Sequence, residues 1–256
     1  MPVGVFGASG RMGRTVCGAV AADPATSLVA AIDVSGAGET IEGVEVSGDP
    51  DAMTRAGAQV VVDFTVAAAA RVNLEWAAQH GLHAVVGTTG FSADDRERFA
   101  SVFSEAERAC VLAPNFAIGA VLAVRLAELA APYFDTAEVI ELHHDAKRDA
   151  PSGTAMHTLE RLAAASTDWA PDPTEEELLP GARGGRGPAG IRVHSVRMRG
   201  MVAHEEVLFG TTGQTLSIRH DSYDRTSFMP GVLLAISRVG SLPPGLTLGL
   251  DALLEL

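Results

Sequence analysis

The first thirteen residues contain the feature that most restricts the fold of this chain. An apolar run over Val3–Phe6 leads directly into a turn with glycine at positions 7, 10 and 13, and apolar residues at helical spacing follow over Arg14–Ala22. A strand, a glycine turn and a helix in this order are typical of a dinucleotide-binding unit, because glycine lets the backbone turn tightly and approach a pyrophosphate. The Gly-x-x-Gly-x-x-Gly spacing is less common than Gly-x-Gly-x-x-Gly, so the prediction depends on the strand before the turn and the helix after it.

The second expected strand, Leu28–Ile32, supports the same interpretation. It ends at Asp33, about twenty residues beyond Gly13, where a carboxylate can accept hydrogen bonds from the ribose hydroxyls of NADH. No arginine stands next to Asp33, but Arg11 lies inside the glycine turn and is near enough to reach the 2′-phosphate of NADPH. We therefore expect the chain to use NADH or NADPH, with NADH at least as good.

Strands and helices alternate up to about residue 116. Strands are expected over 59–64, 83–86 and 110–113, helices over 67–80 and 92–108, and a surface connection without regular structure over 34–50. This order predicts a right-handed, doubly wound parallel sheet, in which ligands bind at the carboxyl ends of the strands. The expected cofactor-binding residues are Gly7, Ala8, Ser9, Gly10, Arg11, Met12, Gly13, Asp33, Phe64, Thr65, Gly87, Thr88, Thr89, Ala113, Pro114, Asn115 and Phe116.

The alternation breaks after a long apolar helix expected over 117–131. Strand composition returns at 191–198, 206–209 and 215–220 without intervening helices, with a hairpin turn at 211–214, and a Pro-, Gly- and acid-rich segment at 166–190 resembles a mobile loop. An apolar helix over 226–239 and a segment at 246–250 could return to the first sheet as an edge element. The predicted fold class is α/β, with a Rossmann-type doubly wound parallel sheet and a second α+β domain that holds a mixed or antiparallel sheet.

The segment Glu141–Ala155 concentrates the residues with useful chemistry. An alternating strand over 137–143 leads into His143, His144 and Lys147, and then into Pro-Ser-Gly-Thr and a helix over 154–163. Backbone N–H groups at a helix start bind anions, here from Ser152, Gly153 and Thr154, and lysine or histidine can donate protons near neutral pH. The segment therefore predicts a small anionic substrate that must receive a proton.

Composition excludes several other classes of function. The net charge is −13 and no basic patch offsets it, which argues against nucleic-acid binding. We expect no signal peptide and no membrane-spanning helix, because the apolar start is broken at once by the glycine turn and no later stretch approaches about 20 uninterrupted apolar residues. Cys17 and Cys110 lack the spacing of metal or redox sites, so we expect buried free thiols, no metal and a cytoplasmic location.

Several motifs together resemble the 4-hydroxy-tetrahydrodipicolinate reductase family, historically dihydrodipicolinate reductase, over nearly the whole chain. These motifs are the segments 3–13, 85–91, 113–119 and 141–155, with Arg219–Ser222 and Arg225–Phe228. The resemblance implies a two-domain homotetramer of lysine and diaminopimelate biosynthesis that reduces a cyclic imine dicarboxylate with NADH or NADPH. We expect residues 1–117 and 227–256 to form the dinucleotide-binding domain, and residues 118–226 to form the substrate-binding and oligomerisation domain.

The resemblance also implies roles for individual residues. It makes His143 the proton donor or acceptor and Lys147 the proton donor, both catalytic. It gives substrate contacts to His144, and carboxylate binding to Gly153 and Thr154.

Two alternatives remain open at this point. A different dinucleotide-dependent enzyme is possible, although a semialdehyde dehydrogenase needs a thiolate and neither cysteine is near the polar segment. A dinucleotide-sensing regulator or inactive relative would be expected to lack Lys147 and the Pro-Ser-Gly-Thr segment, and both are present.

Overall fold

The computed structural model of the chain describes residues 1–255, which form two compact units. The first consists of Met1–Ala117 together with the chain from Arg225 onward, and the second consists of Ile118–Asp224. The chain therefore leaves the first unit after Ala117 and returns to it two residues earlier than the sequence suggested.

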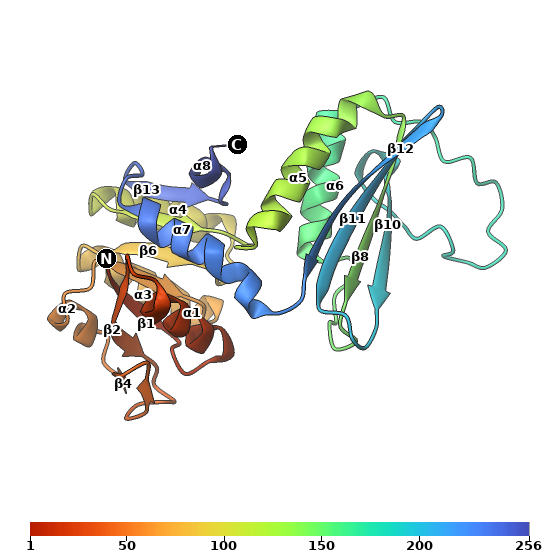
Figure 1. The fold of residues 1–256 in the computed structure, drawn as a ribbon. Helices are drawn as coiled ribbons and strands as arrows, with labels where there is room; N and C mark the ends of the chain where they lie inside the picture. Colours follow the sequence, from red (N-terminus) through yellow and green to blue (C-terminus); the bar gives the residue numbers. More distant parts are fainter. Residues whose placement is uncertain (256) are drawn as a thin grey trace. The chain divides into compact units, whose positions relative to one another are not determined.

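An eight-stranded sheet is the centre of the first unit, with the strand order β13-β7-β6-β5-β1-β2-β4-β3 (Figure 1). Every neighbouring pair is parallel except β3 with β4. The strands are β1 (Pro2–Phe6), β2 (Ser27–Ile32), β3 (Thr40–Ile41), β4 (Val44–Ser47), β5 (Val60–Asp63), β6 (His83–Val86), β7 (Ala109–Leu112) and β13 (Gly245–Leu248). Strands β5, β6 and β7 are apolar on both faces because helices cover both faces of the sheet. The expected doubly wound parallel sheet is confirmed.

The helices of this unit pack on the sheet in two groups. The apolar cluster around Leu74, Phe99 and Phe103 fills one face under α2, α3 and α4, while α1 packs with α7. The helices are α1 (Arg11–Ala22), α2 (Asp51–Arg55), α3 (Ala67–Gln79), α4 (Ala93–Glu105), α7 (Met229–Val239) and α8 (Asp251–Leu254). A capping box is present at the start of α4, where the side chains of Ser92 and Asp95 each accept from the other residue's backbone N–H.

The segment 34–50 was wrongly expected to lack regular structure. Its hairpin β3–β4 extends the sheet beyond β2, and buried Ile41 and Val46 fix the hairpin against the core. Glu42 and Gly43 form the turn with φ of 49° and 81°, the left-handed pair of a type I′ hairpin. Glu-Gly is a weaker signal of that turn than Asn-Gly or Asp-Gly, and strands of two and four residues show little periodicity.

Two helix starts also differ from the sequence prediction. Helix α1 begins at Arg11 instead of Arg14, because Gly10 already takes the extended conformation of an N-cap. The expected helix over 226–239 is α-helical only from Met229, and a 3₁₀ turn, η3 (Arg225–Phe228), precedes it. Pro230 stands at the second position of α7, where a missing N–H costs no hydrogen bond.

A five-stranded mixed sheet is the centre of the second unit, with the order β12-β11-β8-β10-β9. Strands β8 and β10 are parallel and the other pairs are antiparallel, as expected of a mixed sheet. Both long helices lie on one face of this sheet (Figure 1). The elements are α5 (Ile118–Ala130), η1 (Ala131–Tyr133), β8 (Thr136–His143), α6 (Gly153–Ala165), β9 (Gly185–Arg186), η2 (Pro188–Gly190), β10 (Arg192–Arg197), β11 (Ala203–Thr211) and β12 (Gln214–Ser222).

The segment 166–190 is a long connection with regular structure only at its end. No helix or strand occurs over 166–184 in this described segment, and the short strand β9 then pairs with β10. The hairpin expected at 211–214 is present, because Thr211 pairs with Gln214. Cys17 and Cys110 are buried and free, as expected. Among residues 1–255, none of the helices combines the length and hydrophobicity that a membrane span requires.

Candidate active site

The glycine turn between β1 and α1 has the close packing that a dinucleotide site needs. A Cβ atom on Gly13 would lie 2.0 Å from the carbonyl oxygen of Gly7, so only glycine lets the helix approach the strand this closely. Gly7 has φ +68°, and a Cβ there would meet the Thr65 side chain at 2.8 Å. The first N–H groups of α1, from Arg11 and Met12, have no acceptor within the helix and can bind an anion.

Asp33 is held beside this turn. Its carboxylate accepts hydrogen bonds from the Ser9 N–H at 3.1 Å, the Ser35 N–H at 2.9 Å and the Ser35 hydroxyl at 2.6 Å. Burial opposes ionisation, but these hydrogen bonds outweigh it and hold the pKa of Asp33 below the ordinary value. A carboxylate fixed in this way is ready to accept hydrogen bonds from a ribose diol.

A fully buried carboxylate at the end of β5 connects the loops that follow β5 and β6. Asp63 accepts from the Thr65 N–H at 2.9 Å, from the hydroxyls of Thr65 at 2.7 Å and Thr88 at 2.9 Å, and from the Asn73 amide at 2.8 Å. The side chains of Thr65 and Thr88 are therefore fixed by one acceptor. Strands β1, β5, β6 and β7 are neighbours, so the expected cofactor segments, including Thr89, Ala8 and Pro114, follow strands that end along one edge of the sheet.

Two aromatic rings pack together at this edge. The centroids of Phe64 and Phe116 are 5.5 Å apart, and a Cβ on Gly87 would lie 1.9 Å from the Phe64 ring. Phe116 is buried, as is the neighbouring Ala113. The side-chain oxygen Oδ1 of Asn115 accepts from the Ala117 N–H at 2.9 Å, which leaves the side-chain NH₂ group to donate to a cofactor carboxamide.

In the second unit, charged side chains at the ends of β8 and β10 form a hydrogen-bonded line. The Nδ1 atom of His143 is 2.5 Å from Glu141 Oε2, and Arg197 donates to both oxygens of Glu141 at 2.9 and 2.7 Å. Glu141 is completely buried, and Arg197 also donates to the carbonyl of Asp149 at 2.6 Å. The arrangement fixes the orientation of the His143 ring and connects β8, β10 and the loop before α6.

The protonation states along this line follow from burial and hydrogen bonding. Burial opposes ionisation of Glu141, but hydrogen bonds from Arg197, Ser195 and His143 outweigh it and hold the pKa of Glu141 below its ordinary value. Burial also lowers the pKa of His143, and the Glu141 carboxylate opposes that effect only in part. A neutral His143 donates its Nδ1–H to Glu141, so its Nε2 carries the lone pair that can exchange a proton.

Lys147 and His144 lie in the loop that follows. The Lys147 ammonium donates to both carboxylate oxygens of Asp149 at 2.9 and 2.8 Å, and its backbone N–H donates to the carbonyl of His144 at 3.2 Å. The Lys147 charge is near enough to His143 to help lower the pKa of that imidazole. Lys147 and His143 thus lie near one another, His144 is exposed beside them, and Asp149 balances the lysine charge.

Helix α6 begins next to the same cluster. The Ser152 hydroxyl accepts from the Ala155 N–H at 3.1 Å as an N-cap, and the Ser152 N–H donates to Glu141 at 3.3 Å. Both polar groups of Ser152 are therefore used internally, and the residue is buried. The next two N–H groups, from Gly153 and Thr154, have no acceptor within the helix and can bind a carboxylate together with the helix dipole.

The sequence did not assign roles to Glu141, Arg197, Asp149 or Asp63. One signal for Glu141 was available, because it falls on the same register as Ala137 and Val139, the buried face of β8. A carboxylate at a core position needs a partner. Arg197 could not be chosen as that partner, since it is 56 residues away and the pairing of β8 with β10 is a tertiary contact.

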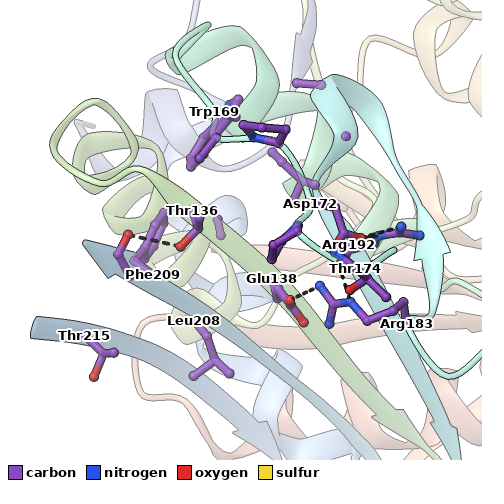
Figure 2. Close-up of a pocket in the computed structure, with 18 residues that line it drawn as sticks. Thr136, Glu138, Trp169, Asp172, Thr174, Arg183, Arg192, Leu208, Phe209 and Thr215 are labelled. Carbon is purple, nitrogen blue, oxygen red and sulfur yellow. Dashed lines mark hydrogen bonds and ion pairs between the residues drawn. The ribbon is translucent and has the colours of Figure 1, made fainter. Parts of the chain in front are cut away.

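The second unit also contains a cavity of about 540 Å³ that includes none of the predicted site residues (Figure 2). It lies between the connection after α6, with Trp169, and the sheet at the start of β8, with Glu138, and the end of β11, with Leu208. Its charged groups are paired: Arg183 donates to Glu138 at 2.6 Å, and Arg192 donates to Asp172 at 2.7 Å. The cavity therefore offers no free charge to an ionic ligand among its described residues.

The parallel sheet with its glycine turn, followed by a separate second unit, defines this protein as a two-unit α/β protein with a dinucleotide-binding fold. An amine dehydrogenase from Mycobacterium smegmatis shares the fold, with a TM-score of 0.65 over 96% of this chain and 94% of the other, at 15% identity. Family models described as the N-terminus and the C-terminus of dihydrodipicolinate reductase match residues 1–116 and 119–254. The chain belongs to the dihydrodipicolinate (4-hydroxy-tetrahydrodipicolinate) reductase family.

Individual relatives agree with this assignment. The chain is 49% identical over all of its length to the 4-hydroxy-tetrahydrodipicolinate reductase of Mycobacterium marinum, which it covers completely. It is 50% identical to that of Nocardia farcinica, over 99% of this chain and 98% of the relative. A dipicolinate-bound dihydrodipicolinate reductase from Paenisporosarcina sp. TG-14 has a TM-score of 0.88 and 35% identity, with 98% of each chain covered. The expected resemblance is confirmed, and the family uses NADH or NADPH.

Proposed function

We propose that this chain performs its family's reaction, the reduction of a cyclic imine dicarboxylate to tetrahydrodipicolinate, with the side chains that follow β8 and the start of α6. The observation that carries this proposal is the hydrogen-bonded line from Arg197 through buried Glu141 to His143, which lies beside two helix-start amides without internal acceptors. A dicarboxylate needs both an anion site and a proton source, and this segment provides them together.

The start of α6 holds one carboxylate of the substrate. The N–H groups of Gly153 and Thr154 donate to it, and the helix dipole favours its negative charge. Ser152 contributes indirectly, because its inward hydroxyl caps the helix and fixes the orientation of the two amides. His144 provides a further polar contact from the loop. Fixing the substrate at its carboxylate supplies the positioning that lowers the barrier to reaction.

Lys147 and His143 transfer protons to and from the substrate. Lys147 donates to the substrate atom on which negative charge develops, and a bound carboxylate replaces Asp149 as its counter-ion. His143 is neutral and presents Nε2, so it exchanges protons with the substrate while Glu141 and Arg197 hold its ring in place.

The first unit holds the cofactor. The nicotinamide, when bound, would supply a hydride to an electron-poor carbon of the substrate. The amides at the start of α1 bind the pyrophosphate, Asp33 binds the ribose, and Asn115 orients the carboxamide. The glycine turn fits this ligand because its packing leaves no room for a Cβ at position 13.

We further propose a homotetramer in the cytoplasm. The face of the second sheet without α5 and α6 carries partly exposed apolar side chains such as Ile140 and Leu208. A sheet face of this kind gains stability when another copy covers it. Reduced, buried Cys17 and Cys110 and a biosynthetic role fit the cytoplasm. Light scattering should give four times the chain mass, and a monomer mass would contradict the assembly.

Binding of a substrate mimic tests the proposed function. Pyridine-2,6-dicarboxylate should bind the protein in calorimetry when NADH is present. The double variant Gly153→Leu/Thr154→Ala should weaken that binding at least about tenfold, or 1.4 kcal/mol, because a side chain enters the carboxylate site. NADH affinity is the matched control and should not change. Absence of binding of the mimic to the unmodified protein would contradict the dicarboxylate substrate.

A further inference from the structure

Glu205 is a partly buried acid beneath the start of α6 to which the mechanism gives no role. In the register of the sheet it lies directly opposite Glu141 on β8 and opposite His220 on β12. Directly paired residues project from the same face of a sheet, so Glu205 shares the helix-covered face with Glu141. The hydroxyl of Thr158, in the second turn of α6, is 2.5 Å from Glu205 Oε1.

The hydrogen bonds of the Thr158 hydroxyl indicate whether Glu205 is protonated or ionised. The fully buried hydroxyl of Thr158 has one hydrogen but lies within hydrogen-bond distance of two acceptors, Glu205 at 2.5 Å and the Thr154 carbonyl at 3.1 Å. An ionised Glu205 would leave one of these two contacts without a hydrogen. A protonated Glu205 donates to Thr158, which then donates to Thr154, and both contacts become hydrogen bonds.

The charges around Glu205 favour the same form. Glu141, on the neighbouring strand β8, is ionised, and its carboxylate already accepts hydrogen bonds from Arg197 and His143. His220, on the other side, has a pKa lowered by burial, so it provides no positive charge. In the part of the chain that the structure describes, no lysine or arginine forms an ion pair with Glu205, and the charged groups of α6 nearest in sequence, His157 and Glu160, are exposed. Burial, opposed in part by Thr158 and reinforced by Glu141, raises the pKa of Glu205 to about 7.

We propose that Glu205 is a positioning residue that is protonated when substrate binds, and that its ionisation weakens binding of the dicarboxylate at the start of α6. This inference rests on the proposed function. Ionised Glu205 takes the Thr158 hydrogen away from the Thr154 carbonyl, which loosens the turn that holds the two substrate-binding amides. It also places a negative charge beneath an anion site, where like charges repel.

The pH dependence of mimic binding tests this inference. If only protein with protonated Glu205 binds pyridine-2,6-dicarboxylate, the Kd of this mimic should rise about tenfold between about pH 6 and about pH 8. Any change in Kd from the histidines would add to this. Glu205→Gln keeps the neutral, hydrogen-bonding form, so this tenfold component should disappear and tight binding should persist at the higher pH. Glu160→Gln, an exposed change of the same charge on α6, is the control and should retain the unmodified profile.

Two results separate the possible failures. Parallel pH profiles for the unmodified protein and Glu205→Gln would overturn the role of Glu205 while leaving the dicarboxylate site intact. Absence of binding at every pH would instead contradict the proposed function. Infrared difference spectra provide a readout that needs no ligand: a protonated carboxylic acid band should be present at about pH 6, lost with a midpoint near pH 7, and absent from Glu205→Gln. A spectrum without such a band would also overturn the proposal.

Discussion

Glu141 is the single side chain on which most of the candidate active site depends. It accepts hydrogen bonds from His143, Arg197 and the Ser152 backbone, which belong to two strands and a helix start. A completely buried carboxylate in such a position costs free energy unless its partners are present. Its role is therefore structural and electrostatic at once: it orients His143 and compensates the charge of Arg197.

Glu141→Gln should destabilise the protein by about 1.5 to 3 kcal/mol at neutral pH, the range for lost hydrogen bonds to a charged partner. The folded-state pKa of Glu141 lies below its ordinary value of 4.5, so its stabilising contribution is present above that value and is lost as the pH falls through the folded pKa. Thermal unfolding of both proteins over this range should show the difference shrinking in acid. Asp145→Asn, at an exposed pair with Arg199, is the control, and an equal loss from it would contradict the special role of Glu141.

The residues with catalytic chemistry could be predicted from the sequence more readily than the residues that support them. His143 and Lys147 lie in one short segment, and their chemistry follows from their residue types. Arg197 and Glu205 reach the same place only through the pairing of β8 with β10 and β11. Sequence spacing contains no information on that pairing, so these supporting residues required the structure.

At the scale of elements, the approach of α1 to β1 determines the shape of the cofactor turn. A Cβ on Gly13 would meet backbone atoms of Gly7 and Ala8 at 2.0 to 2.8 Å, and backbone cannot move aside as a flexible side chain can. A Cβ on Gly18, in the same helix, would meet only the Glu42 side chain at 3.7 Å, which is ordinary contact. The two glycines thus differ in packing while they share one helix.

Gly13→Ala should destabilise the protein by about 1 to 3 kcal/mol, a typical effect of overpacking, and should weaken NADH binding. Gly18→Ala is the matched control and should be neutral or should stabilise the helix by up to about 1 kcal/mol. Denaturant unfolding and NADH fluorescence titration measure the two effects. Equal stability and equal NADH affinity in both variants would show that the close approach at Gly13 is not required.

The elements that the sequence predicted well are those with long periodic patterns or strong caps, such as α4 with its capping box and the apolar strands β5, β6 and β7. The hairpin β3–β4 was missed because its strands are short and its turn, at Glu42 and Gly43, has a weak sequence signal. The early start of α1 was missed because glycine at an N-cap has no side chain to identify it.

At the scale of the whole molecule, the sequence suggested that the segment at 246–250 could return to the first sheet as an edge element. Strand β13 pairs with β7 at the edge of the first sheet, as expected for a returning segment. How the copies of the chain assemble depends on a sheet face whose partner is another molecule, and a single sequence contains no direct signal for it. The choice of cofactor is also a property of the folded first unit, and we expect residues around the glycine turn to determine it.

NADH should be at least as good a cofactor as NADPH, because Asp33 lies beside the turn and would repel a 2′-phosphate. Arg11 is exposed at the start of α1 and can offset that repulsion. Arg11→Ala should therefore lower kcat/KM with NADPH more than with NADH. Arg14→Ala is the comparison, since Arg14 is already bound to Ser9 and Glu39 and should affect both cofactors alike. A preference of the unmodified protein for NADPH above about tenfold, or 1.4 kcal/mol, would contradict this prediction.

Oxidation of NADH in the presence of freshly generated cyclic substrate tests the central claim most directly. The unmodified protein should oxidise NADH only when the substrate is supplied, and Lys147→Ala should lower kcat by about 10² or more while NADH affinity changes little, because the proton donor is lost. Exposed Arg148→Ala is the neighbouring control and should retain the unmodified rate. No substrate-dependent oxidation by the unmodified protein would contradict the reductase function, and an unchanged rate in Lys147→Ala would contradict the assignment of Lys147 as the proton donor.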